Sequence, residues 1–416
     1  MRNRPLKIAM VVASPFPANH GTPGSIGEMA GAMAQRGHDV HVVTYHFGEG
    51  KISERVHIHR IADLGFSRKV VVGPTTGKPL LDLLMVFTLC SVIFRENIDV
   101  IHAHNYEGAL VGFPARLITG KPLIYNAVNT MSDELETYNF FKPKILGNLL
   151  AKALDYWVPR TADRILAISS ELVAFLEGRK IESGRIRMIP LGIDMTQFAS
   201  NGRQEQMPTQ SPLRQDAGSR PTVIYTGILD RMQRIDYLIR AMKVVVEAVE
   251  NARLLLVVNI AKEEDLKEFQ ALIEELGLRN HVDIVMSQSF DEIPGYLAGA
   301  DVAVACRPHC PGFPVKLLNY MAAGKAIAAF EGSAKGLQHL SSAFVVKDHD
   351  WQALGKGIAT LLQQPGLAAE LGRRARQWAA RYFSWPRIAS DIEEVYAELL
   401  ERHVPEAWGA PESSRR

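Results

Sequence analysis

Short runs of apolar residues alternate with helix-forming segments along almost the whole chain, and this rhythm restricts the fold more than any other feature. The run "KIAMVVA" (7–13) is apolar after Lys7, as a strand buried on both faces of a parallel sheet requires. We expect further strands of the N-terminal half, with helices between them, at 38–45, 57–63, 98–104, 121–129 and 162–170. This order predicts an α/β fold, with a parallel sheet covered by helices on both faces.

The rhythm stops at a polar segment that contains Pro and Gly (200–220) and then resumes, so we interpret this segment as a linker. A chain of 416 residues has room for two such domains. We predict two doubly wound, Rossmann-like domains that face each other across a ligand cleft at the carboxyl ends of their strands. The predicted parts are an N-terminal domain (1–199), the linker (200–220), a C-terminal domain (221–385), a helix that packs back toward the N-terminal domain (386–404) and a disordered tail (405–416).

Composition excludes several classes of protein. The net charge of +2 does not indicate nucleic acid as a partner, and three cysteines do not form a disulfide framework. The pair in "CRPHC" (306–310) lacks the second pair of ligands that a metal site needs. The longest apolar stretch (80–94) is too short to span a bilayer, and we interpret it as a buried helix. We therefore expect a cytoplasmic protein without a metal or other cofactor.

The segment "PGFPVKLLNYMAAGKAIAAF" (311–330) predicts an anion site. A turn at Gly312 and Phe313 leads into a helix, and Pro314 suits a first turn because it lacks an N–H group. The unpaired amides of a helix start attract negative charge. Lys316 opposes the helix dipole at this position, and its placement is better explained if an anion binds there than if it is a solvated lysine.

Six motifs, in order, resemble the family 4 glycosyltransferases over roughly residues 5–400. They are "GEMAGAMAQRGHDVHVVT", "IDVIHAH", "ADRILAISSEL", "IPLGIDMTQF", "YTGILDRMQRIDYLIRAM" and "GFPVKLLNYMAAGKAI". The resemblance implies the GT-B fold and a retaining, metal-independent transfer of a sugar. The donor would be a UDP- or GDP-sugar and the acceptor a hydroxyl of a glycan or a lipid-linked molecule, as in cell-surface or exopolysaccharide synthesis.

The resemblance implies a donor site with several departures from the family pattern. Its predicted residues are Gly21, Gly227, Arg231, Arg234, Gly312, Phe313, Lys316 and Asn319. Pro311 and Asn319 stand where the family has two glutamates, and Ile228 and Gln233 stand where it has an arginine and a lysine. Arg231 and Arg234 are close enough to supply the missing charge, although the alternative is that both are surface residues.

Residues at strand ends of the N-terminal half are the candidate catalytic groups. His102 and His104 alternate with apolar residues, so both project from one face of a strand. His104 is the better candidate because it is nearer the carboxyl end, whereas His102 is better explained as a buried structural histidine. Many family members have a histidine where Val128 stands, and Asn129 reaches the cleft if the strand ends before it.

Asp133 and Glu134 are candidate bases on the acceptor side, or else an ordinary acidic pair at a helix start. The segment "HGTPGS" (20–25), which we expect to be a loop before the first helix, does not have the glycine spacing of a dinucleotide site. "DHD" (348–350) is expected to be a turn.

Two alternatives to an active transferase remain open at this stage. The departures at the expected active site favour a catalytically silent relative that binds a nucleotide sugar or a partner, and a sugar-nucleotide epimerase shares the same fold. The mixture of aromatic residues and lysines at 138–157 suits a helix at the membrane surface, or a helix that lines the acceptor cleft. The expected location is therefore cytoplasmic, with peripheral contact to the inner face of the membrane through 138–157.

Overall fold

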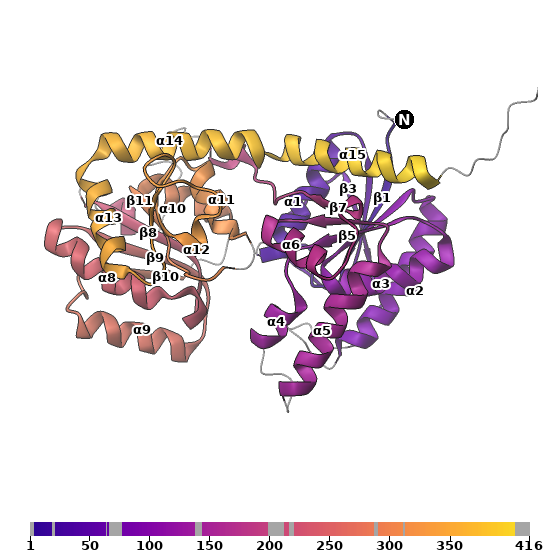
Figure 1. The fold of residues 1–416 in the computed structure, drawn as a ribbon, viewed down its shortest axis with the longest axis horizontal. Coiled ribbons are helices and arrows are strands. Elements are labelled where there is room, and N and C mark those ends of the chain that lie inside the picture. The colour runs from indigo at the N-terminus through magenta and orange to yellow at the C-terminus, as the bar shows by residue number, and fades with distance from the viewer. Residues whose placement is uncertain are drawn as a thin grey trace, which may run out of the picture. The chain divides into compact units, whose positions relative to one another are not determined.

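The chain folds into two compact units, each built around one parallel sheet (Figure 1). This computed structural model describes residues 4–18, 21–63, 65, 77–137, 144–198, 212–215, 220–286, 290–310 and 313–403. The described residues of unit 1 lie within 1–18, 22–190 and 388–416, and those of unit 2 lie within 19–21 and 191–387.

Unit 1 contains a seven-stranded sheet in the order β3-β2-β1-β4-β5-β6-β7, with every pair parallel. Its strands are β1 (Lys7–Val12), β2 (Asp39–Thr44), β3 (Val56–Arg60), β4 (Val100–His104), β5 (Leu123–Ala127), β6 (Arg164–Ala167) and β7 (Ile186–Met188). Its helices are α1 (Gly21–Gln35), α2 (Lys78–Glu96), α3 (Asn105–Thr119), α4 (Met131–Thr137), α5 (Lys144–Thr161), α6 (Ser170–Gly178), the 3-10 turn η1 (Ser183–Arg185) and α15 (Trp385–His403).

Alternation along β4 explains how this sheet is covered on both faces. A side chain at Gly112 of α3 would touch the side chains of Ile101 and Ala103, so α3 packs on that face. His102 points to the opposite face, where its Nδ1 lies 2.7 Å from the hydroxyl of Tyr396 on α15. The predicted βαβ architecture of this half is therefore confirmed.

Unit 2 contains a six-stranded parallel sheet in the order β10-β9-β8-β11-β12-β13. Its strands are β8 (Thr222–Leu229), β9 (Arg253–Ala261), β10 (Val282–Met286), β11 (Val302–Ala305), β12 (Ala326–Phe330) and β13 (Phe344–Val346). Its helices and 3-10 turns are η2 (Met195–Phe198), α7 (Pro212–Gln215), η3 (Arg231–Gln233), α8 (Ile235–Ala248), α9 (Glu263–Glu275), η4 (Phe290–Glu292), α10 (Ile293–Gly299), α11 (Val315–Ala322), α12 (Glu331–Ala334), α13 (Trp351–Gln363) and α14 (Pro365–Tyr382). Apolar residues of β8, β9, β11 and β12 form one core with α8 and α13.

Three local predictions need correction. The loop expected at 20–25 is already helical from Gly21, which has φ +55, because Pro23 in the first turn has a backbone torsion suited to a helix. The linker contains the short helix α7, whereas residues 199–211 and 216–219 lie outside the described residues, as does the tail predicted at 405–416. Pro314 is the N-cap of α11 rather than a first-turn residue.

Helix α2, which we expected to be buried, has one apolar face in solvent. Met85, Leu89, Val92 and Ile93 are buried, but Leu80, Leu83, Phe87 and Phe94 are between 43% and 66% exposed. The high average hydrophobicity of this run suggested a buried helix, but it does not tell whether other residues cover the helix on every side. None of the helices in the described ranges is long and apolar enough to cross a membrane.

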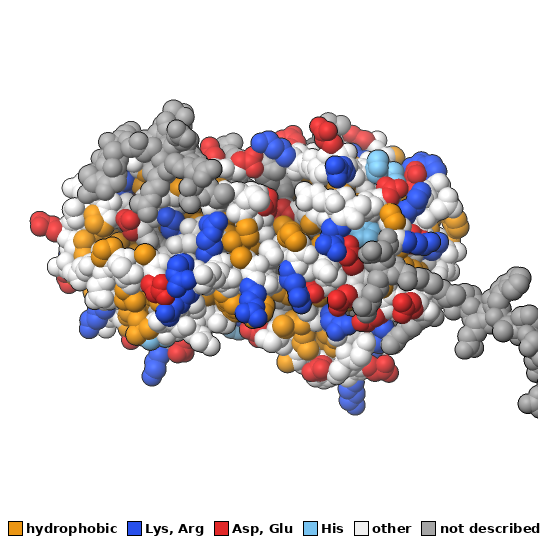
Figure 2. Space-filling model, turned by 90° about the horizontal axis from the view of Figure 1, so that it is seen from above, with side chains coloured by type: hydrophobic (Ala, Val, Ile, Leu, Met, Phe, Trp, Pro, Cys, Tyr) orange, Lys and Arg blue, Asp and Glu red, His pale blue; other side chains and the backbone are white. Residues whose placement is uncertain are grey.

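The visible face of the molecule in Figure 2 mixes basic, acidic and hydrophobic side chains. Neither unit presents a surface of a single charge sign on that face, in agreement with the net charge of +2.

Candidate functional site

Lys316 is held at the carboxyl end of β8 by two other segments of unit 2. Its Nζ donates hydrogen bonds to the hydroxyl of Tyr225, at 2.6 Å, and to Oε1 of Gln233, at 3.0 Å. The same ammonium lies 4.0 Å from the centre of the Tyr225 ring, a favourable cation–π distance. Tyr225 comes from β8 and Gln233 from η3, whereas Lys316 lies in the first turn of α11. The side chain is therefore fixed by the fold and is not a freely solvated lysine.

Among the described residues, the Lys316 ammonium has no charged hydrogen-bond partner, because Tyr225 and Gln233 are both neutral. Burial, the main cause, lowers the pKa of Lys316 from 10.5 to about 8. At neutral pH roughly nine-tenths of the side chains still carry the positive charge. Burial also raises the pKa of the neighbouring Cys306 thiol to about 12, so that thiol stays neutral. Asp230 is the nearby carboxylate that acts on Lys316, and it opposes the effect of burial without forming a hydrogen bond to Nζ among the described residues. A partly buried cation whose described hydrogen-bond partners are neutral is suited to bind an anionic ligand.

Gly227 allows Lys316 to approach β8 closely. Its φ of +129 belongs to a backbone region that favours glycine, and a Cβ at this position would lie 3.1 Å from Nζ of Lys316. The register of β8 against β9 shifts between Gly227 and Leu229, so the strand is irregular at this point. Any larger residue at Gly227 would displace the ammonium.

Arg231 and Arg234 already have carboxylate partners. Arg231 is 73% exposed and binds Glu268 of α9 at 2.5 Å. Arg234 forms two hydrogen bonds of 2.9 Å with Asp236, and its guanidinium lies 3.7 Å from the centre of the Tyr237 ring. Such surface ion pairs contribute little free energy, so a phosphate could compete for either guanidinium. Their role in donor binding stays a prediction.

Two other residues predicted on the donor side, Phe313 and Asn319, lie just before α11 and within it. Asn319 is 7% exposed, and Phe313 packs against Phe383 with ring centroids 5.2 Å apart. Gly312 and Pro311 lie outside the described residues. The hydroxyl of Tyr320 accepts a hydrogen bond of 2.9 Å from the backbone N–H of Thr226, which joins α11 to β8. The sequence motifs did not indicate that Tyr225 and Gln233 hold Lys316, because these contacts join residues 91 and 83 positions apart.

His102 and His104 stack on one face of β4, as their alternation predicts. Their ring centroids lie 4.5 Å apart. His102 is a buried, hydrogen-bonded histidine, as expected, and burial lowers its pKa to about 3. Burial also lowers the pKa of His104 far below its usual value, and the charge of His102 acts in the same direction. His104 is therefore neutral at pH 7. Its Nδ1 lies 3.1 Å from Nδ2 of Asn126, and its buried Nε2 has no hydrogen-bond partner in the described part of the chain.

Asn129 lies just beyond β5, which ends at Ala127. Its Nδ2 donates to Oε2 of Glu134 at 2.5 Å, while its Oδ1 is buried without a partner among the described residues. Burial raises the pKa of the Glu134 carboxyl. The Thr130 hydroxyl accepts a hydrogen bond from the backbone N–H of Asp133 and donates one to the Asp133 carboxylate, so Thr130 caps the start of α4 and Asp133 is bound in that cap. Glu134 is thus better suited than Asp133 to act on a ligand.

Gly21, predicted on the donor side, is exposed at the start of α1, and a Cβ there would touch no other atom within 4 Å. Its positive φ favours glycine, so the helix start explains this residue without a ligand. Around "DHD", Asp350 caps α13 by accepting a hydrogen bond of 2.8 Å from the N–H of Ala353, so this segment is the turn that we expected.

Two family models match consecutive parts of this chain. The family described as Glycosyltransferase Family 4 matches residues 21–197, and the family described as Glycosyl transferases group 1 matches residues 209–378. The D-inositol 3-phosphate glycosyltransferase of Salinispora tropica is 26% identical over 361 residues, which span 81% of this chain and 73% of the relative.

Solved structures share the fold over nearly the whole length. Sucrose-phosphate synthase from Thermosynechococcus elongatus has a TM-score of 0.77 and 19% identity, with 95% of this chain and 100% of that chain covered. Anabaena Alr3699/HepE, solved in complex with UDP-glucose, has a TM-score of 0.72 and 20% identity over the same shares. The two parallel sheets and these neighbours define a two-domain GT-B fold. The two family matches, over residues 21–197 and 209–378, show that this chain belongs to the family 4 glycosyltransferases.

Proposed function

We propose that this protein is a retaining, metal-independent hexosyltransferase. It would move a sugar from a UDP- or GDP-sugar to a hydroxyl of a glycan or lipid-linked acceptor, as in cell-surface or exopolysaccharide synthesis. The observation that carries the proposal is the Lys316 ammonium, which is held by the neutral groups of Tyr225 and Gln233 and has no charged hydrogen-bond partner in the part of the chain that the structure describes.

Departure of the nucleoside diphosphate develops about two negative charges, which a fixed cation stabilises in the transition state. Lys316 supplies one fixed positive charge at the start of α11, and the unpaired backbone N–H groups there add partial charges of the same sign. The surface guanidiniums of Arg231 and Arg234 would exchange their carboxylates for the diphosphate. Positive charge supplied by the protein fits a leaving group that departs without a metal ion.

A donor complex of one structural neighbour supports the proposed donor class. Anabaena Alr3699/HepE has been solved with UDP-glucose, so a UDP-sugar is the first donor to test. On the acceptor side, His104 and Asn129 each keep one buried hydrogen-bonding atom without a partner among the described residues. We assign these two atoms to hydroxyl groups of the reacting sugars. Asn129 also holds Glu134, whose raised pKa suits a group that accepts a proton from the acceptor.

Helix α5 supports contact with a membrane surface. The buried residues of α5 include few large apolar side chains: they are Gly147, Ala151, Asp155, Val158 and Pro159. Its large apolar residues point outward and are between 40% and 70% exposed: Ile145, Leu146, Leu149, Leu150, Tyr156 and Trp157.

The buried carboxylate of Asp155 fixes α5 in this orientation. It accepts hydrogen bonds from the hydroxyl of Tyr106 at 2.6 Å and from the N–H of Met131 at 2.8 Å. An outward apolar face with Lys152 and Arg160 beside it suits an interfacial helix. We therefore propose that α5 lies against the inner, cytoplasmic face of the membrane. Residues 138–143 of the segment predicted for this contact lie outside the described residues.

The competing proposal is a silent relative that binds the nucleotide sugar without transferring it. The carboxylate partners of Arg231 and Arg234 favour this alternative, because a guanidinium that keeps its carboxylate adds no charge to the leaving group. Val128 favours it as well, since its side chain cannot form a hydrogen bond.

One experiment separates the two proposals. Purified protein is screened against UDP- and GDP-sugars by thermal shift, and the best donor is then incubated with membrane extract as a source of acceptor. An active transferase releases the nucleoside diphosphate, whereas a silent relative is stabilised by the donor without releasing it. Lys316→Met should lose both effects. Lys267→Met, which changes a lysine that is 71% exposed on α9, should keep them. Donor binding that is equal in wild type and Lys316→Met would refute the assignment of this site.

A further inference from the structure

A surface pocket of about 520 Å³ lies between β3 and α2 in unit 1. Strand β3 is the outer strand of the seven-stranded sheet, so the pocket lies at the side of the sheet and away from the strand ends that carry His104 and Asn129. The lining residues come from one strand and one helix: Ile58, His59, Arg60, Phe87, Thr88, Ser91, Val92 and Arg95. The proposed transfer reaction uses none of them.

The lining has two chemical parts. Arg60 and Arg95 supply nitrogen donors, His59 supplies a titratable ring nitrogen, Thr88 and Ser91 supply hydroxyls, and no carboxylate is among the described residues that line the pocket. Ile58, Phe87 and Val92 supply an apolar wall. Arg60 donates to the carbonyl of Tyr45 at 3.2 Å and to the carbonyl of Gly48 at 3.5 Å, and three of its five N–H groups remain for a ligand. Two arginines beside an apolar wall suit an anion that is attached to an apolar group.

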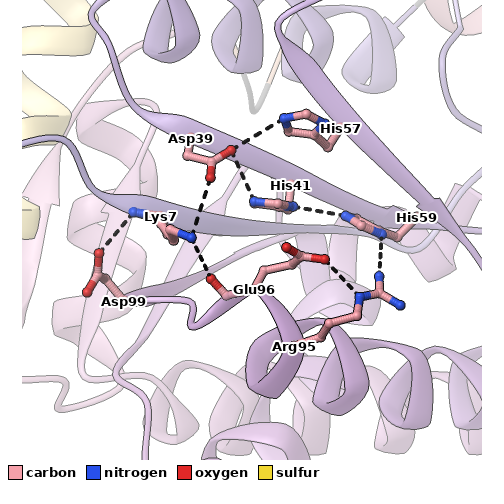
Figure 3. A network of polar contacts seen from close by, with 8 residues as sticks. All are labelled: Lys7, Asp39, His41, His57, His59, Arg95, Glu96 and Asp99. Carbon is pink, nitrogen blue, oxygen red and sulfur yellow. Dashed lines mark hydrogen bonds and ion pairs between the residues drawn. The ribbon is translucent and has the colours of Figure 1, made fainter.

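Figure 3 shows a network of hydrogen bonds and ion pairs that runs from the pocket into the sheet. Nδ1 of His59 lies 3.3 Å from a guanidinium nitrogen of Arg95, and an arginine can only donate. Neutral His59 therefore carries its proton on Nε2, which lies 2.9 Å from Nδ1 of His41. His41 then carries its proton on Nε2, which lies 3.1 Å from a carboxylate oxygen of Asp39 but does not form a hydrogen bond with it. The two hydrogen bonds of this chain therefore run from Arg95 to His59 and from His59 to His41.

A proton on Nδ1 of His59 would face the Arg95 cation, so the empty pocket disfavours protonated His59. Burial is the main cause of its lowered pKa, and His41, Arg95 and His57 act in the same direction while Glu96 opposes them.

Two other charged pairs complete the surroundings. Nζ of Lys7 lies 3.9 Å from Asp39, and Nε of Arg95 donates to Glu96 at 2.8 Å. An anion bound between Arg95 and His59 would offset the repulsion and favour the protonated ring.

We propose that this pocket binds the phosphate group of an amphiphilic ligand, with Arg60 and Arg95 on the phosphate and Phe87 against the apolar part. The outward side of α2 extends the apolar wall, because Leu80, Leu83 and Phe94 are exposed along the same helix as Phe87. A phosphate joined to an apolar group occurs both in soluble phosphate esters and in lipid headgroups. Binding is coupled to uptake of a proton by His59.

Isothermal titration calorimetry with phenyl phosphate and with inorganic phosphate tests the pocket. We expect phenyl phosphate to bind more tightly than inorganic phosphate, and Phe87→Ser to remove that difference. Arg95→Gln should weaken the binding of phenyl phosphate by at least about tenfold, since a hydrogen bond to a charged group is lost. Arg373→Gln is the matched control, because the two arginine side chains are 54% and 60% exposed and each pairs with a neighbouring glutamate.

The proton coupling is tested by comparing wild type with His59→Asn at about pH 5.5 and about pH 7.5, on either side of the ordinary histidine pKa of about 6.5. The titration of the phosphate itself affects both proteins equally, so only the difference between them reports on His59. We expect acid to favour binding more strongly in wild type than in His59→Asn.

Sedimentation with phosphatidylcholine vesicles, with and without phosphatidic acid, distinguishes the two sources of the ligand. Vesicle binding that needs phosphatidic acid and is lost in Arg95→Gln indicates that the ligand is a lipid. Binding of phenyl phosphate without binding to the phosphatidic acid vesicles indicates that the ligand is a soluble phosphate ester. Equal binding by wild type and Arg95→Gln, or no binding of either probe, would overturn the proposal. Sugar transfer to a soluble acceptor should be unchanged in Arg95→Gln, so this test is independent of the proposed function.

Discussion

Replacing Lys316 by Met should leave the ligand-free protein at least as stable as wild type, although it removes the proposed donor site. Met keeps the apolar stem of the side chain over the Tyr225 ring and removes the charge. Tyr225 and Gln233 keep a partner after the change, because the Tyr225 hydroxyl lies 3.3 Å from Oε1 of Gln233. The substitution therefore leaves neither polar group buried alone.

The magnitude follows from the pKa of Lys316. A fall from 10.5 to about 8 corresponds to about 3 kcal/mol of free energy that disfavours the charged form in the folded protein. The side chain is only partly buried, so solvent screening reduces this figure. We expect the free energy of unfolding of Lys316→Met to exceed that of wild type by about 1–2 kcal/mol at neutral pH.

The sign of the pH dependence provides a second test. Between about pH 8 and about pH 10.5 the unfolded chain binds more protons at Lys316 than the folded chain, so wild-type stability rises with pH. The advantage of Lys316→Met should therefore shrink over this range. Urea unfolding at several pH values measures it, with Lys267→Met as the control for loss of an exposed lysine. A variant that is less stable than wild type, or a stability difference that does not change with pH, would refute this account of Lys316.

Three further outcomes are expected. Gly227→Ala should lower the free energy of unfolding by about 1–2 kcal/mol, measured by urea unfolding, because alanine is strained at the positive φ of this residue. It should also weaken donor binding, measured by thermal shift, because the added Cβ lies close to the Lys316 ammonium. Because burial lowers the pKa of His102 to about 3, its contribution to the free energy of unfolding is complete above about pH 6.5 and is lost as the pH drops toward about 3. In unfolding curves measured over this acid range, His102→Asn should reduce the slope of stability against pH by about 1.4 kcal/mol per pH unit. Leu149→Ser with Trp157→Ser should reduce flotation of the protein with anionic vesicles while leaving its melting temperature within a few degrees of wild type, because both side chains are mostly exposed.

Much of the fold could be predicted because buried parallel strands leave a strong local signal. The strand predicted at 7–13 contains the whole of β1 (Lys7–Val12), and the other strands predicted in the N-terminal half overlap the observed ones. Helix boundaries were less certain: the glycines before α1 suggested a loop, but the helix begins among them. The exposure of α2 was missed because burial depends on what packs against a helix, which its own sequence does not specify.

The candidate site shows the same division between local and distant information. The period of two residues in a strand was enough to place His102 and His104 on one face. The pair formed by Arg234 and Asp236 joins residues two positions apart and could have been anticipated. The partners of Lys316 could not, because Tyr225 meets it only when β8 and α11 pack together. The Arg231 partner Glu268 lies 37 positions away, on a different helix.

The most direct test of the central claim follows the leaving group and the new bond in one reaction. The donor that stabilises the protein best is incubated with the acceptor fraction, the released nucleoside diphosphate is quantified, and the anomeric configuration of the product is read by NMR. The account predicts release of diphosphate without added metal, a product with the configuration of the donor, and loss of both in Lys316→Met. Donor binding without diphosphate release, or a product of inverted configuration, would contradict it.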